Sequence, residues 1–197
     1  IGAVGLAFAL RGAAPTASAP ATTLAASPPS VSGSPTAEPF PNTAERRLMQ
    51  RLPPTIGRDC QRINGRSGDP ASGLFTAQMS ETNLRCAPTA SNPEAVRVYE
   101  FRNVDTRLGS PKTVLFWEGG NRGIFQSGAC ATDERALQEW RTGGERAGYL
   151  LCYVEKGKAN LWWTHDASRI LIWAVARDAD RKALWEWWLR TGPFLGL

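Results

Sequence analysis

The fold is decided by residues 149–176, which read YLLCYVEKGKANLWWTHDASRILIWAVA. This stretch holds three apolar runs of strand length, and each is rich in aromatic or branched side chains. The runs are residues 149–154, 159–164 and 169–176. Lys156-Gly157 predicts a hairpin turn between the first two runs, and residues 165–168 predict a turn before the third. Strands joined by turns this short pair antiparallel, so we expect an antiparallel sheet here.

Further strands and helices are expected around this core. Upstream, the sequence predicts strands at 73–79, 83–87, 95–101 and 113–118, while Cys60 is expected in a loop. A helix is expected over 133–141, with Thr132 as its cap, Leu137 and Trp140 on one face, and Gly143-Gly144 at its end. A last helix is expected over 180–190.

The first helix of the domain is predicted from its cap. Asn42 and Glu45 have the spacing of an N-cap and its reciprocal partner, and apolar residues follow at helical spacing until Pro53-Pro54. Together these elements predict an α+β fold. It would have a small antiparallel sheet of about six or seven short strands, with an N-terminal, a middle and a C-terminal helix.

The four cysteines, Cys60, Cys86, Cys130 and Cys152, are widely spaced and form no Cys-x-x-Cys pair. An even number behind an apolar leader suggests two disulfides in an oxidising compartment, although a reduced cytosolic protein is the alternative. Three pairings are possible. We favour the two local ones, Cys60–Cys86 and Cys130–Cys152, each contributing about 3 kcal/mol by loop entropy.

The chain before the domain has two parts. Residues 1–11 are expected to be the end of a transmembrane helix, or else the apolar region of a signal peptide with Ala17-Ser18-Ala19 as its cleavage site. Residues 12–42 are Pro, Ser, Thr and Ala with almost no charge, which predicts a disordered stalk. Residues 43–197 are then the extracytoplasmic disulfide-bonded domain.

Motifs for chemistry are absent from the sequence. His165 lies beside Asp166 and near Ser168, but three neighbours in one turn do not make a catalytic triad. A zinc site from Cys130, Cys152 and His165 matches no known spacing, and the glycines of residues 119–123 fit no phosphate loop. We therefore predict no catalytic, cofactor or metal site in this chain.

The net charge of +5 comes mainly from scattered arginines, which argues against nucleic-acid binding. The unusual feature is a set of eight tryptophans. Most are expected in the core, but Trp162, Trp185 and Trp187 are candidates for an exposed binding surface, because indole rings stack on sugars and grip partners.

The C-terminal part resembles a known family over the segments GYLLCY (148–153), GKANLWWT (157–164), ILIWAVARD (170–178) and ALWEWW (183–188). The chain is similar there to a domain at the extracytoplasmic C-terminus of some actinobacterial and Chloroflexi serine/threonine kinases, also seen in lipoproteins and uncharacterised membrane proteins. The positions that carry the likeness are Cys152, Gly157, Trp163-Thr164, Asp166 and Trp187-Trp188. Leu52-Pro53-Pro54 and Cys86-Ala87-Pro88 add to it.

The family usually has a helix after the strand at 95–101, whereas Gly109-Ser110-Pro111 interrupts one here, so the resemblance conflicts with a strand at 113–118. The apolar leader, the stalk, the paired cysteines and the resemblance together predict a non-catalytic sensor or interaction domain, anchored to the membrane by its N-terminal helix and belonging to a serine/threonine kinase. Its partner would be an unknown extracellular ligand or cell-wall component, and a homodimer is possible. The alternative is a secreted or lipid-anchored cell-envelope binding protein with no kinase partner.

Overall fold

The computed structural model of the chain describes residues 38–57, 59–63, 80–89, 92–102, 110–124 and 127–191. The predicted leader, the predicted stalk as far as residue 37 and the predicted strand at 73–79 lie outside these residues. Within the described ranges, no helix is long and apolar enough to cross a membrane.

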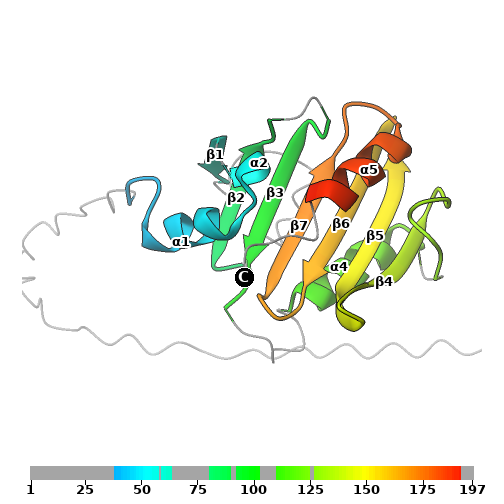
Figure 1. The fold of residues 1–197 in the computed structure, drawn as a ribbon, viewed down its shortest axis with the longest axis horizontal. Helices are drawn as coiled ribbons and strands as arrows, with labels where there is room; N and C mark the ends of the chain where they lie inside the picture. Colours follow the sequence, from blue (N-terminus) through cyan, green and yellow to red (C-terminus); the bar gives the residue numbers. More distant parts are fainter. Residues whose placement is uncertain are drawn as a thin grey trace, which may run out of the picture. The chain divides into compact units, whose positions relative to one another are not determined.

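The described residues form one antiparallel sheet with helices on both of its faces, which confirms the α+β class. The strand order is β1-β2-β3-β7-β6-β5-β4 (Figure 1). The strands are β1 (Asp59–Arg62), β2 (Thr82–Ala87), β3 (Ala95–Glu100), β4 (Ala136–Thr142), β5 (Glu145–Glu155), β6 (Lys158–His165) and β7 (Ile170–Val175). The helices are α1 (Thr43–Arg51), α2 (Pro54–Gly57), α4 (Pro111–Asn121) and α5 (Arg181–Thr191).

The three predicted core strands are β5, β6 and β7, paired antiparallel as expected. Lys156 and Gly157 have φ values of 51° and 72°, so both turn residues are left-handed. This is the backbone of the hairpin turn that matches the twist of the two strands it joins. The C-terminal helix prediction is also confirmed, as α5.

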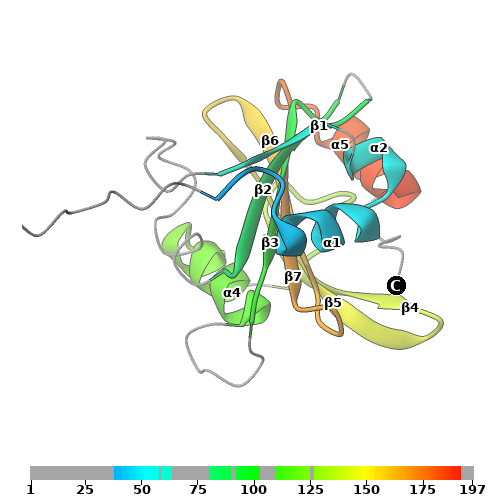
Figure 2. The same ribbon diagram turned by 90° about the vertical axis from the view of Figure 1, so that its left-hand side faces the viewer.

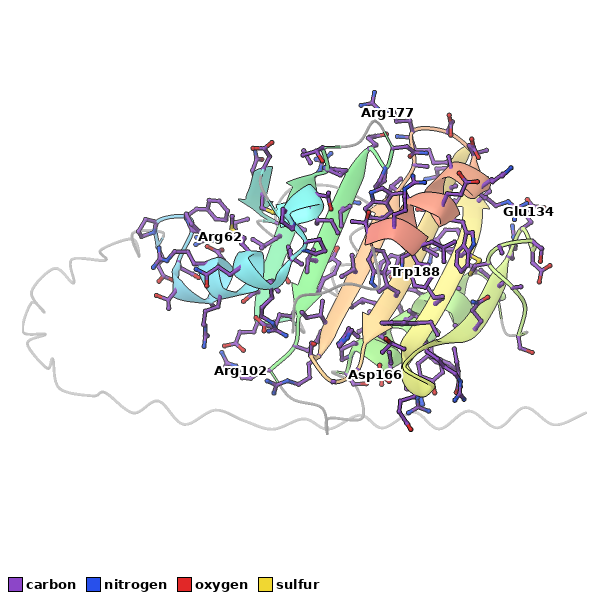
Figure 3. The ribbon with its side chains drawn as sticks, in the orientation of Figure 1. Arg62, Arg102, Glu134, Asp166, Arg177 and Trp188 are labelled. Atoms are coloured by element: carbon purple, nitrogen blue, oxygen red, sulfur yellow. A yellow bond between two sulfur atoms is a disulfide. The ribbon has the colours of Figure 1, made fainter. Side chains whose placement is uncertain are left out.

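The two faces of the sheet are covered by different helices, as the edge-on view in Figure 2 shows. Helices α1, α2 and α5 lie on one face, and α4 lies on the other, over β5, β6 and β7. Because side chains alternate along a strand, Trp163 packs under α5 while its neighbour Trp162 packs on the α4 face. The Trp188 side chain of α5, labelled in Figure 3, is buried, and its ring centroid lies 6.0 Å from that of Trp140 on β4.

The N-terminal capping prediction is confirmed. Asn42 Oδ1 accepts a hydrogen bond from the Glu45 backbone N–H at 2.9 Å, and Asn42 N–H donates to Glu45 Oε2 at 2.7 Å. The buried Glu45 carboxylate also pairs with Arg62 on β1, and this hydrogen bond is the main reason that the pKa of Glu45 lies below its ordinary value. The cap of α1 is thereby tied to the edge of the sheet.

The predicted strand at 113–118 is wrong, because these residues belong to helix α4. The Ser110 side chain accepts from the Thr113 backbone N–H at 3.2 Å, and Pro111 occupies the first helical position. A serine cap followed by proline is a helix-start signal, and here it outweighs the strand preference of the Thr-Val-Leu-Phe-Trp run.

The predicted middle helix at 133–141 is also wrong, since residues 136–142 form β4. Ala136 and Trp140 are buried toward the core, and Trp140 Nε1–H donates to the Thr164 carbonyl at 2.8 Å. Pairing with β5 therefore decides the conformation, and the middle helix of the fold is α4 instead. Cys60, expected in a loop, lies on β1.

Both predicted disulfides are confirmed, as Cys60–Cys86 and Cys130–Cys152. The first joins directly opposed residues of β1 and β2. All four cysteines belong to the core on the α1 and α5 face, so the opposite face carries no cross-link among the described residues.

Candidate ligand-binding cleft

A single row of register-paired residues crosses all seven strands of the described sheet on the α4 face. The row runs Leu137, Leu151, Trp162, Trp173, Arg97, Arg85 and Gln61, from β4 to β1. The members of the row on β4, β5, β6 and β7 are apolar, and α4 packs over the last three of these strands. Beyond β7 the row changes to two arginines, which puts positive charge next to the strands that α4 mainly covers, β5, β6 and β7.

The middle of the row is a stack of two indoles and a guanidinium. The Trp162 and Trp173 rings are 4.5 Å apart and 9° from parallel, and the Arg97 guanidinium carbon lies 4.3 Å from the Trp173 ring centroid. Trp162 Nε1–H donates to Tyr153 Oη and Trp173 Nε1–H donates to Asn160 Oδ1, each at 3.0 Å. Both indole donors are therefore satisfied, which fixes the rings in place.

Arg97 is an unusual residue for this position, because only 6% of its surface is exposed. Burial lowers the pKa of its guanidinium below the ordinary value, although arginine still carries its charge at neutral pH. The aromatic face of Trp173 compensates part of the lost hydration through a cation–π contact. The stack therefore holds a desolvated positive charge at a fixed place.

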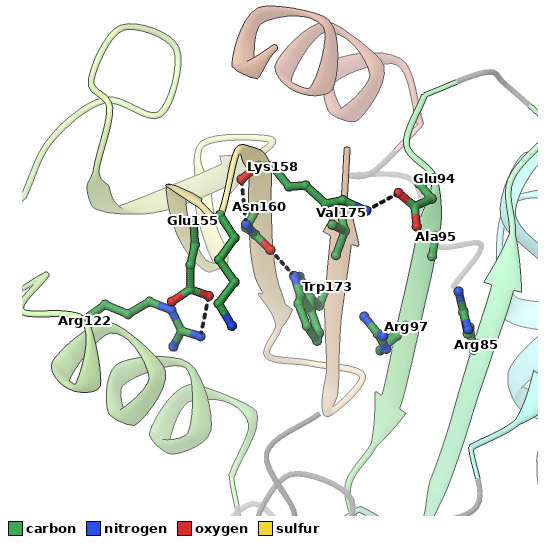
Figure 4. Close-up of a pocket in the computed structure, with 11 residues that line it drawn as sticks. Arg85, Glu94, Ala95, Arg97, Arg122, Glu155, Lys158, Asn160, Trp173 and Val175 are labelled. Carbon is green, nitrogen blue, oxygen red and sulfur yellow. Dashed lines mark hydrogen bonds and ion pairs between the residues drawn. The ribbon is translucent and has the colours of Figure 1, made fainter. Parts of the chain in front are cut away.

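A cleft of about 440 Å³ opens above this stack (Figure 4). Trp173, Arg97 and Val175 belong to its floor on β7 and β3, and Arg122 at the end of α4 borders it on one side. Among the described residues, seven charged side chains line the cleft. They are Arg85, Arg97, Arg122, Lys156, Lys158, Glu94 and Glu155, so the cations outnumber the anions by five to two.

The two acidic side chains are already matched with cations. Lys158 Nζ lies 2.5 Å from Glu94 Oε2, and Arg122 Nη2 lies 3.6 Å from Glu155 Oε2. In the part of the chain that the structure describes, Arg85 forms no ion pair, nor does Lys156. The described lining of the cleft thus presents a surplus of positive charge.

Arg122 is held firmly in the wall of the cleft. It pairs with Glu118 one turn earlier in α4, and its guanidinium carbon lies 4.5 Å from the Tyr153 ring centroid. Glu118 is 4% exposed, and burial raises the pKa of its carboxyl, against the effect of Arg122. Helix α4 therefore fixes one cationic wall as well as covering the apolar end of the row.

A second hollow of about 280 Å³ continues from the cleft toward β1. The two share Arg85, Glu94 and Ala95, and the second reaches Asp59 and Gln61. From β6 to β1 the combined groove crosses four strand intervals, about 19 Å at the usual spacing.

The tryptophans predicted as a binding surface are not brought together. Trp162 is 0% exposed and lies on the α4 face, whereas Trp187 is 3% exposed and packs against Trp163 on the other face. These two indoles are buried and offer no free ring to a ligand, because they fill the core. Trp185 is half-buried and stacks on Trp188 with 4.9 Å between the ring centroids.

The turn at His165 is a packed polar corner. Ser168 Oγ and His165 Nδ1 are 2.7 Å apart and both residues are buried, while Asp166 Oδ1 accepts a hydrogen bond from Thr164 Oγ1. Cys130 and Cys152 are joined to each other, so they are not free to bind zinc with His165. In the described ranges no group of three or more His, Cys, Asp or Glu residues is placed to hold a metal.

The cleft residues were missed from the sequence because they come from separate elements. Arg85, Arg97 and Arg122 are on β2, on β3 and after α4, with no local motif linking them. One signal was available: Arg97 shares its side of the strand with Ala95 and Tyr99, both buried.

Comparisons of the chain with protein-family models, with curated proteins and with solved structures gave no significant match.

Proposed function

We propose that residues 43–197 form a non-catalytic ligand-binding domain with a sensory or interaction role, and that the cleft above Trp173 and Arg97 is its ligand site. The observation that carries the proposal is the buried Arg97 at the floor of the cleft, held over Trp173. Pockets of about 300–1,000 Å³ with a few fixed polar groups are typical of small-molecule sites, and this cleft is within that range.

The proposed location is the extracytoplasmic side of a bacterial cell membrane. Two disulfides support an oxidising compartment. The apolar residues 1–11 and the Pro, Ser and Thr-rich residues 12–42 support an anchor and a stalk. In this proposal the domain is the outer region of a serine/threonine kinase, which rests on the resemblance in residues 148–188.

The ligand site is tested by NMR on the isotope-labelled protein. The Trp173 indole N–H is bonded to Asn160 next to the cleft, so its resonance reports on occupancy. We expect at least one small molecule from a mixed panel of neutral and charged cell-envelope fragments to shift this signal. The proposal fails if no compound shifts it, or if all shifts fall on α1 and α5 on the opposite face.

The location and the kinase link need a separate test. A membrane-impermeant protease added to intact cells of the source organism should remove the domain from the native protein. A reading frame upstream of Ile1 that encodes a lipid-attachment signal and no kinase motifs would favour the alternative, a secreted or lipid-anchored binding protein. In that case peptidoglycan fragments should change the tryptophan emission of the domain.

A further inference from the structure

We infer that the ligand of the cleft carries an oxyanion, a carboxylate or a phosphate group, which binds between Arg85 and Arg97. This inference rests on the proposed function, since it names the chemistry that the cleft would recognise. It is argued from the register of the two arginines, from the burial of one of them and from the charge of the walls.

Arg85 and Arg97 are directly opposed on β2 and β3 and lie on the α4 face (Figure 4). Cβ atoms of such a pair are about 4.5–5.5 Å apart, and like charges at this position destabilise a sheet. A negative group that contacts both guanidinium groups would be attracted by both and would offset this repulsion. Guanidinium donors match the geometry of carboxylate and phosphate oxygens, so both oxyanions fit.

The Arg97 side chain is preorganised for such a ligand. Its side chain is buried and stacked on Trp173, so little conformational freedom remains to be lost on binding. An ion pair made there is also screened less than one on the surface, because the local dielectric is low. Arg85 is exposed and supplies the adjustable side of the same site.

The charges along the groove predict how a bound ligand is oriented in it. Lys156 and Arg122 add positive charge at the β5–β6 side, whereas Asp59 is negative at the β1 end. The anionic group would therefore lie over β2, β3 and β7, and a longer ligand would extend an uncharged part toward β1.

The test uses isothermal titration and NMR on the full chain at fixed ionic strength, because salt screens anion binding. The probes are inorganic phosphate, glucuronate as a carboxylate, and glucose as an uncharged control. We expect phosphate or glucuronate to shift the Trp173 indole signal, and glucose to leave it unchanged. The tighter of the two anions shows whether the natural group is a phosphate or a carboxylate.

Matched variants locate the site. Arg85→Gln should weaken anion binding at least about tenfold, as expected for the loss of a hydrogen bond to a charged group. Arg47→Gln removes the same charge from an exposed position on α1, on the other face, and should leave binding unchanged. Lys156→Gln should weaken binding by a smaller factor, with Lys182→Gln as its control. All four positions are at least partly exposed, so folding is expected to be preserved.

The outcomes separate the two proposals. If a neutral compound of the panel shifts Trp173 but neither anion does, the oxyanion assignment is wrong while the ligand site stands. If no compound of any class shifts it, the proposed function fails as well. Equal weakening by Arg85→Gln and Arg47→Gln would mean only diffuse surface attraction, and would overturn the assignment.

Discussion

Arg97 lies over the face of Trp173, with its guanidinium carbon 4.3 Å from the ring centroid, because the two residues are directly opposed on β3 and β7. The contact is therefore set by strand register and not by a loop. It holds a charged group at the floor of a cleft in a position where the core on that face would otherwise be apolar.

Replacing Arg97 with lysine keeps the charge but removes the planar group that stacks on Trp173. A lysine ammonium is also more strongly hydrated, so burying it costs more. We expect Arg97→Lys to lower the free energy of unfolding by about 1–2 kcal/mol, the size of a desolvated cation–π contact. Urea denaturation measures this, and Arg47→Lys is the matched exposed control, which should be neutral. A neutral Arg97→Lys would show that the stack contributes little.

Replacing Arg85 with glutamine should raise the free energy of unfolding of the ligand-free protein, whereas Arg97→Lys should lower it. The change removes the repulsion from Arg97 across the strands, so we expect a gain in unfolding free energy on the order of 0.5 kcal/mol or less. The midpoint of urea unfolding should rise slightly for Arg85→Gln and stay constant for Arg47→Gln. A lower midpoint for Arg85→Gln would mean that Arg85 stabilises the sheet by itself, which contradicts a repulsive pair.

The loss of stability on replacing a tryptophan with alanine should depend on how deeply that tryptophan is buried. Trp162 is 0% exposed, stacks on Trp173 and donates to Tyr153, so Trp162→Ala should cost about 3–5 kcal/mol. Trp185 is half-buried on α5, so Trp185→Ala should cost only about 1 kcal/mol. Thermal and urea unfolding compare the two variants. A similar cost for both would be evidence against the packing described for Trp162.

The Cys60–Cys86 disulfide should be needed to keep β1 on the sheet. This strand has four residues and pairs only with β2 among the described strands, so the cross-link is a large part of its attachment. The Cys60→Ala/Cys86→Ala double variant should lose about 3 kcal/mol, by loop entropy for a separation of 26 residues.

The local effect is measured by hydrogen exchange. The Ile63 amide, which donates to the Asn83 carbonyl at 3.1 Å, should exchange much faster in that variant. The Cys130→Ala/Cys152→Ala variant is the control, because it should lose similar stability without selective opening of β1. Protection of Ile63 that is equal in both variants would argue against this role of the first disulfide.

The single histidine, His165, predicts that the free energy of unfolding depends on pH. Burial lowers the pKa of His165 below 6.5, with Asp166 acting to raise it and Arg51 to lower it. As the pH falls through 6.5, the unfolded chain binds a proton that the folded domain does not, so stability present above that pH is lost until the folded pKa is reached. The unfolding free energy should therefore fall as the pH is lowered through 6.5.

His165→Gln removes this titration, so the difference in slope between the two proteins isolates it from the carboxylates. Glu118 acts in the opposite direction at lower pH, because burial raises its pKa, but it is present in both proteins. Equal slopes for the wild type and the variant would exclude His165 as the source.

The parts of the fold that could be predicted are those with local signals. The Lys156-Gly157 turn requires two left-handed residues, and the Asn42 and Glu45 cap places α1. The local disulfide pairing was also predicted correctly. By contrast, Leu137 and Trp140 are three residues apart, which suits a helix face, but β4 is held by pairing with β5 and shifts register after Trp140. That bulge is not visible in the sequence.

The cleft could not be predicted for a similar reason. It exists because β3 pairs with β7, which puts Arg97 beside Trp173 although they are far apart in the sequence. Tryptophan count suggested an aromatic surface, but burial depends on which side of a strand each residue occupies. Trp162 and Trp163 show this, as neighbours that are buried in different cores.

The pairing of β3 with β7 also means that the cleft is assembled from two separate lengths of chain. Arg85, Glu94 and Arg97 precede residue 103, while Arg122 and Trp173 follow residue 110. Two polypeptides divided between Arg102 and Ser110 would each contain only part of the cleft. An anion that binds across this junction would favour their reassociation, so fragment complementation could serve as a genetic assay for ligands of the domain.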